Sequence, residues 1–169
     1  MEAVLISIQP YWLFLIIAKT MGWNINKEKT IEIRKNYPTS SNWDKVVKIY
    51  CSKDKKSFAK IPKNYQPLME RFLGKIIGEF VCDEIIDIDL GIEEGVYFNG
   101  EFQEGFETNG AGNNPTCLSF IELENYLTDN KGYGWHISNL VIYDKFLGTR
   151  IPIKRPPQSW CYVESECKE

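Results

Sequence analysis

A short stretch near the N-terminus carries residue types suited to holding a polar ligand. Residues 29–35 read Lys-Thr-Ile-Glu-Ile-Arg-Lys, so polar and apolar residues alternate. In a β-strand this alternation places Thr30, Glu32 and Arg34 on one face and two isoleucines on the other. A hydroxyl, a carboxylate and a guanidinium spaced about 7 Å apart can hold a planar polar ligand. The alternative is an ordinary amphipathic strand with a solvated charged face.

The elements expected around this strand belong to a small mixed fold. Residues 4–8 are almost all apolar, which indicates a buried strand, and Pro10 begins an apolar run to residue 18 that indicates a buried helix. A second short helix is expected over residues 67–73. Further strands are expected over residues 45–51, 76–82, 140–143 and 159–163, the last closing a barrel. We therefore expect an α+β fold, a partly closed mixed β-barrel with two or three flanking helices.

Local signals are clear in the second half of the chain. Asn99-Gly100 predicts a two-residue hairpin turn, because both positions of that turn need positive φ angles. Ser119 stands three residues before Glu122, and this capping box predicts a helix start. The Gly/Asn-rich residues 109–115 predict a mobile loop. Gly132 and Gly134 predict a turn.

The charge is distributed very unevenly along the chain. Residues 1–75 hold fourteen Lys and Arg against six Asp and Glu, whereas residues 76–130 hold thirteen Asp and Glu and no Lys or Arg. A net charge of -3 therefore does not exclude a basic face for an anion. The lysines of residues 53–63 indicate a loop that faces phosphate, with a merely solvated loop as the alternative.

The cysteines indicate neither a metal site nor a disulfide framework. They number five, with no Cys-x-x-Cys spacing and a single histidine in the chain. The apolar run after Pro10 is too short to span a bilayer, and no basic leader precedes it. We expect a soluble, reduced, cytoplasmic protein with no cofactor, no metal and no membrane partner.

Five blocks of this sequence resemble the ASCH domain family of the PUA-like superfamily. They are residues 7–10, 29–35, 74–83, 134–140 and 157–164. The last two blocks look like those of small ASCH-like proteins of bacteriophages and prophages. The resemblance implies a single PUA-like domain over residues 1–169, with an acidic hairpin and a Gly/Asn-rich loop inserted at about 84–116.

The resemblance also implies a ligand, since ASCH domains are thought to bind RNA or nucleotides in a cleft beside the first helix. Carried onto this chain, the cleft would be lined by Ser7, Gln9, Lys29, Thr30, Glu32, Arg34 and Lys35. Trp135 or Trp160 could stack on a base, with core packing as the alternative for each. The expected partner is RNA, a nucleotide or a modified nucleoside.

Some small ASCH proteins are amidohydrolases of N4-acetylcytidine, and this resemblance supplies an enzymatic alternative. Their Lys-Thr-Ile-Thr pattern aligns with residues 29–32, so the nucleophilic threonine falls on Glu32. Thr30 cannot replace it, because on a strand it faces away from Lys29. Glu32 could instead act as general base, with His136 or Lys29 as acid. A ribonuclease is a further possibility, and for His136 the alternative role is to anchor a turn.

A third reading is an interaction protein. The phage-like resemblance and the acidic hairpin favour an accessory protein that blocks or sequesters a host-defence factor or a signalling nucleotide. This reading predicts a stable complex with a host protein or such a nucleotide.

Overall fold

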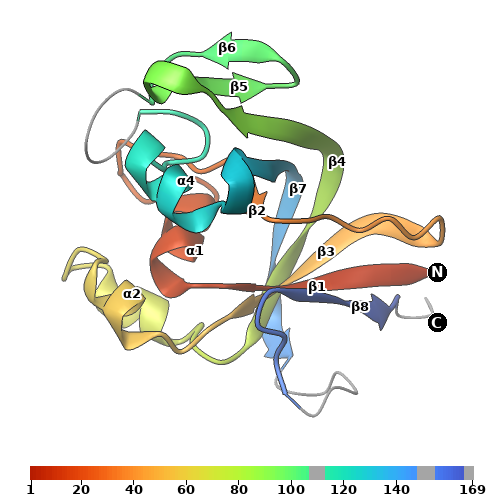
Figure 1. Cartoon of the computed structure of the whole chain (residues 1–169). Coiled ribbons are helices and arrows are strands. Elements are labelled where there is room, and N and C mark those ends of the chain that lie inside the picture. The colour runs from red at the N-terminus through yellow and green to blue at the C-terminus, as the bar shows by residue number, and fades with distance from the viewer. Residues whose placement is uncertain (107–112, 148–154, 166–169) are drawn as a thin grey trace. The chain divides into compact units, whose positions relative to one another are not determined.

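The computed structural model, drawn in Figure 1, describes residues 1–106, 113–147 and 155–165. The chain divides into two compact units. Unit 1 comprises residues 1–23, 38–81 and 139–169. Unit 2 comprises residues 24–37 and 82–138. The predicted loop at residues 109–115 lies outside the described residues up to position 112.

The strands form a mixed sheet. In hydrogen-bonding order the path is β2-β7-β4-β3-β1-β8, with β5 beside β4 and β6 beside β5. Their bounds are β1 Glu2–Ile8, β2 Ile31–Arg34, β3 Trp43–Cys51, β4 Ile76–Leu90, β5 Val96–Phe98, β6 Glu101–Gln103, β7 Lys131–Leu147 and β8 Trp160–Glu164. The chain therefore has the mixed α+β architecture that the sequence predicts.

In unit 1 the central strand is β1. It pairs in parallel with β3, where Val4 lies opposite Val47, and antiparallel with β8, where Val4 lies opposite Tyr162. Figure 1 shows β1 between these two neighbours. The fully buried Val4 and Ile6 explain the nearly continuous apolar run in the sequence. The strand predicted over residues 159–163 is confirmed by β8, but its predicted role in closing a barrel is wrong among the described residues, because β8 ends the sheet path and pairs there with β1.

Three short helices belong to unit 1: α1 Pro10–Ile17, α2 Lys55–Ala59 and α3 Gln66–Glu70. The helix α1 begins at Pro10 and is mostly buried, as predicted. The expectation of a loop over residues 53–63 is wrong at α2, because the Asp54 carboxylate accepts a hydrogen bond from the Ser57 N–H and starts a helix there. No helix in the described ranges is long and apolar enough to cross a membrane.

Unit 2 contains the helix α4 Phe120–Tyr126 and two single-turn 3-10 segments, η1 Ile92–Glu94 and η2 Thr128–Asn130. The capping box is confirmed: the Ser119 hydroxyl accepts from the Glu122 N–H, and the Glu122 carboxylate accepts from the Ser119 N–H. The hairpin is confirmed as well. Asn99 and Gly100 join β5 to β6 with φ angles of 50° and 82°, as a two-residue turn of this kind requires.

Two strands are longer than predicted. β4 continues through the acidic stretch to Leu90, because Ile86, Ile88 and Leu90 alternate inward and only the intervening acids need water. β7 begins at Lys131, so the turn expected at Gly132 and Gly134 is wrong.

The glycines of β7 serve close packing instead of turning the chain. A Cβ at Gly134 would lie 2.7 Å from Cγ2 of Ile31, and one at Gly132 would lie 2.3 Å from Cδ2 of Leu127. Ile31 and Ile33 pack in the core of unit 2 with residues of β4 and α4. Because Gly132 and Gly134 have no side chain, Leu127 and Ile31 can pack directly against β7 at these two positions.

Candidate ligand-binding site

The strand β2 lies in unit 2 and is buried on both faces. Glu32 is 6% exposed and Arg34 is 8% exposed, although their neighbours Ile31 and Ile33 fill the opposite, apolar face. Glu32 lies opposite Trp135 of β7. The polar face that the sequence predicts therefore exists, but the fold encloses it.

Three charged groups form a buried cluster on this face. A Glu32 carboxylate oxygen lies 3.4 Å from a guanidinium nitrogen of Arg34, and the other lies 3.8 Å from the ammonium of Lys29. That second oxygen, Oε2, is buried and makes no hydrogen bond within the described residues. Two cations around one carboxylate give the cluster a formal charge of +1, and such charges are tolerated in a protein interior only when paired.

Lys29 is the most deeply buried member, at 2% exposed. Burial lowers the pKa of its ammonium below the ordinary 10.5, while the negative charge of Glu32 acts in the opposite direction. The Nζ atom also donates a hydrogen bond of 2.7 Å to the carbonyl oxygen of Thr116. Lys29 thus joins the start of β2 to a segment far along the chain.

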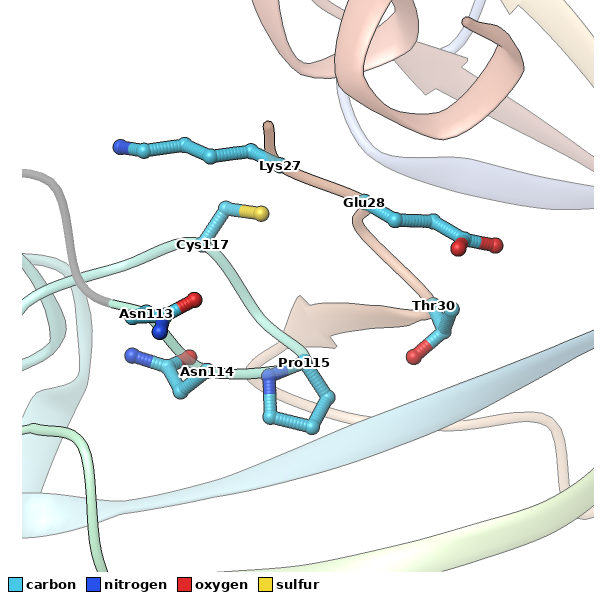
Figure 2. Close-up of a pocket in the computed structure, with 7 residues that line it drawn as sticks. All are labelled: Lys27, Glu28, Thr30, Asn113, Asn114, Pro115 and Cys117. Atoms are coloured by element: carbon cyan, nitrogen blue, oxygen red, sulfur yellow. The ribbon is translucent and has the colours of Figure 1, made fainter. Parts of the chain in front are cut away.

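A pocket of about 290 Å³ opens where these two segments meet, and we call it the Thr30 pocket. Figure 2 shows one segment, which carries Lys27 and Thr30, facing the other, which carries Pro115, across the opening. Both segments belong to unit 2. The seven lining residues are Lys27, Glu28, Thr30, Asn113, Asn114, Pro115 and Cys117.

Asn114 shapes the wall of the pocket. Its amide nitrogen donates to the carbonyl oxygens of Gly105 and Leu118, at 3.1 and 2.8 Å. Its amide oxygen accepts from the backbone N–H and the hydroxyl of Thr116, at 2.9 and 2.5 Å. All the hydrogen-bonding groups of this side chain are engaged, so its role is structural.

Other polar groups of the pocket are available to a ligand. The ammonium of Lys27, the hydroxyl of Thr30 and the amide of Asn113 make no hydrogen bond or ion pair within the described residues. Cys117 differs, because burial raises the pKa of its thiol although Lys29 and Lys27 act to lower it. The Cys117 thiol is therefore protonated at neutral pH and is a poor nucleophile.

The sequence-predicted site residues occupy different environments. Thr30 lines the pocket, while Lys35 is exposed with its ammonium 5.3 Å from the ring centre of Tyr126. Trp135 is fully buried and its indole N–H donates to the carbonyl oxygen of Asn36 at 3.2 Å. Its ring therefore packs in the core, which was the alternative to base stacking, and offers no face to a base in this structure.

Three other predicted residues belong to unit 1 and are described within it. The Ser7 N–H donates a hydrogen bond to the carbonyl oxygen of Ser159. Gln9 is the exposed residue before α1. The Trp160 ring packs edge to face on that of Tyr162, with ring centres 5.4 Å apart.

His136 lies in the middle of β7, so the expectation that it anchors a turn is wrong. Its Nδ1 lies 2.6 Å from a carboxylate oxygen of Asp83 on β4, and both side chains are partly exposed. A carboxylate at this nitrogen fixes the tautomer of the ring. Asp83 has no signal in the sequence that would link it to a histidine 53 positions away.

The contact that joins the two walls of the pocket could not be found from the sequence either. Thr116 and Lys29 are separated by 87 positions, and no local pattern predicts their contact. Across the described parts of the chain, no group of three or more His, Cys, Asp or Glu side chains could hold a metal ion.

The elements and their strand order define a small mixed α+β protein whose fold is similar to that of a solved ASCH structure. The structure of ASCH from Zymomonas mobilis superposes with a TM-score of 0.57 and 15% sequence identity, covering 96% of this chain and 87% of that one. A tyrosine-to-phenylalanine mutant of the same Zymomonas mobilis protein gives a TM-score of 0.53 and 14% identity, covering 96% and 90%. No protein-family model and no curated protein matches this sequence. The predicted mixed α+β fold class is thus confirmed.

Proposed function

We propose that this chain binds RNA or a nucleotide, with one nucleotide held in the Thr30 pocket. The observation that carries the proposal is that Lys27, Thr30 and Asn113 line the same pocket, and that the polar group of each has no partner among the described residues. Ligand sites combine a concave shape with a few such convergent polar groups. A volume of about 290 Å³ suits one nucleotide better than a longer ligand.

The chemistry of the pocket matches a nucleotide. A lysine ammonium is a common partner of phosphate, and a side-chain amide offers a donor beside an acceptor, as a base edge does. The resemblance to ASCH domains, which are thought to bind RNA or nucleotides, supports the same ligand class. We propose that the charges of Lys29, Glu32 and Arg34 set the electrostatic potential of this site and that the three residues help to fix its shape. Their direct contact with the ligand stays a prediction.

The pocket is tested by ligand binding to matched lysine variants. Mass spectrometry identifies any nucleotide released by heat, and calorimetric titration then measures its affinity for wild type and for Lys27→Gln. Loss of one charge-assisted hydrogen bond predicts about tenfold weaker binding. Lys131→Gln is the control, because Lys131 is an exposed lysine of the same unit outside the pocket. Equal affinity of Lys27→Gln and wild type would reject the pocket as the site.

A second candidate function is hydrolysis of a modified nucleoside such as N4-acetylcytidine, or of RNA. The favouring observation is the buried pair of Lys29 and Glu32, in which burial lowers the pKa of the lysine. Glu32 would take a proton from the attacking water, and Lys29 would give one to the leaving amine, which releases acetate and cytidine. His136, the alternative acid of the sequence prediction, lies opposite Ile31 and therefore on the other face of the strand pair from Glu32. Glu32→Gln should stop acetate release yet keep substrate binding, with circular dichroism as the check on folding. Unchanged turnover in this variant would exclude the mechanism.

The interaction-protein reading, including a phage origin, stays a prediction. Phe102 of β6 is 55% exposed and Ile92 is 92% exposed beside the acids of the β5–β6 hairpin, which favours a protein contact there. A host factor that co-elutes with the wild type in gel filtration, and no longer with Phe102→Ser, would support it.

A further inference from the structure

The segment between β3 and β4, which contains α2 and α3, forms a strongly basic part of unit 1. Its residues 53–75 hold six lysines, and all six are exposed. We call them the lysine surface: Lys53, Lys55, Lys56, Lys60, Lys63 and Lys75. The segment contains two acids in all, Asp54 and Glu70.

The charges of the lysine surface are not neutralised within the described residues. None of the six lysines forms an ion pair there, and the Asp54 carboxylate is engaged by the Ser57 N–H at 2.8 Å. Lysines that only support a helix typically pair with acids three or four residues away. Here the cations face solvent without such partners.

Packing inside unit 1 fixes the position of the segment that carries these lysines. The Ser57 hydroxyl accepts a hydrogen bond of 3.0 Å from the Tyr11 N–H, which holds the buried side of α2 against α1 and leaves its lysines outside. Figure 1 shows α2 next to α1. The two ends of the segment also meet, because the Gly74 N–H donates to the carbonyl oxygen of Cys51 at 2.8 Å.

The glycine at this closure brings Lys53 next to Lys75. Gly74 has a φ angle of 73°, and a Cβ at this position would lie 2.3 Å from Cε of Lys53. The Lys53 side chain therefore crosses directly over Gly74, one residue before Lys75. Lys53 thus lies over the residue before Lys75, although 22 positions separate the two lysines in the sequence.

We propose that the lysine surface binds the phosphate backbone of single-stranded RNA without regard to base sequence. This inference rests on the proposed RNA ligand but assigns it a second contact, in unit 1, that the Thr30 pocket does not supply. Residues 76–130 carry thirteen acids and no Lys or Arg, so a backbone contact outside the Thr30 pocket is favoured at the lysines of residues 53–75. Phosphate contacts of this kind give affinity and not sequence selection.

An anionic membrane is the less favoured partner for the same charges. Membrane-surface helices present a wide apolar face, whereas α2 and α3 are five residues each. Leu68 is the large apolar residue that residues 53–75 expose, at 41%.

The test compares a triple variant, Lys55→Gln with Lys56→Gln and Lys60→Gln, with wild type. A fluorescent oligouridylate of about 12 nucleotides is titrated at several salt concentrations. The quantity compared is the steepness of the plot of log K, the RNA association constant, against the logarithm of the salt concentration. For single strands each lost phosphate contact reduces this steepness by about 0.7, so the triple variant should be less steep than wild type by about 2. The matched control is Lys45→Gln with Lys131→Gln and Lys145→Gln, which removes the same charge elsewhere and should keep most of the slope.

Two readouts separate this inference from the proposed function. Titration with uridine 5′-monophosphate reports on the pocket, and the triple variant should bind it as wild type does. If mononucleotide binding is absent but the RNA slope falls in the triple variant, the pocket fails and the lysine surface stands. Equal RNA slopes for wild type and triple variant, or binding only to phosphatidylserine vesicles, would overturn the lysine surface.

Discussion

The ammonium of Lys29 donates a 2.7 Å hydrogen bond to the carbonyl oxygen of Thr116, which ties together the two walls of the Thr30 pocket. Beside it, the backbone N–H groups of Thr30 and Ile31 both donate to the carbonyl oxygen of Pro115, at 2.9 and 3.1 Å. A residue that the sequence singles out for chemistry therefore also holds the pocket in shape. Its two roles can be separated by experiment.

Substitution of Lys29 should destabilise the fold. In Lys29→Met the carbonyl of Thr116 loses its donor and Glu32 loses one of its two cations, which should cost about 1–3 kcal/mol in the free energy of unfolding. Urea denaturation followed by circular dichroism measures the change. Lys63→Met is the control, because Lys63 is exposed and should change stability by less than about 0.5 kcal/mol. Equal stability of the two variants would show that the Lys29 contacts contribute nothing.

The pH dependence of stability should report the burial of Lys29. Its pKa is lowered in the folded chain from the ordinary 10.5, so in the window between the lowered value and 10.5 the unfolded chain binds more protons. Stability contributed by this group therefore rises with pH across that window.

The stability of wild type relative to Lys29→Met should then improve as the pH is raised from about 7 towards about 10. Using the difference between the two proteins cancels the titration of groups that do not interact with Lys29. A difference that stays constant over this range would contradict the lowered pKa.

Asn113 and Asn114 are adjacent but should respond differently to alanine. Asn114→Ala removes all four hydrogen bonds of its amide and should lower the free energy of unfolding by about 1–3 kcal/mol. Asn113→Ala removes an exposed amide without a partner in the described residues, so it should keep stability and weaken nucleotide binding. Thermal unfolding and nucleotide titration on both variants test the contrast, and the reverse pattern would reject the assignment of their roles.

A methyl group at Gly78 should be poorly tolerated. A Cβ there would lie 2.2 Å from the backbone oxygen of Val141 on β7, which cannot move without shifting the strand. Gly78→Ala should therefore cost about 1–3 kcal/mol, as overpacking typically does. At Gly95 the nearest atom to a new Cβ is the Tyr97 ring at 3.0 Å, so Gly95→Ala should cost less. Chemical denaturation of the two variants gives the comparison.

The local signals of the sequence were sufficient for several elements. The alternation in residues 29–35 correctly predicted that Ile31 and Ile33 enter the core, and Asn99-Gly100 and the Ser119 capping box correctly predicted a hairpin and a helix start. Each of these features depends on residues close together in the chain. Backbone φ preference, side-chain capping and strand alternation act over that range, so one sequence is enough to reveal them.

The candidate site depended on tertiary structure, because its contacts join distant residues. In the folded chain β2 pairs with β7 and both Glu32 and Arg34 are buried, although their spacing alone equally fits an open face. The same packing brings Thr116 to Lys29 and Asp83 to His136. The sequence by itself determined which residues carry charge and which face of each strand is apolar. Only the folded chain decided which charges are buried and paired, since desolvation depends on what packs around them.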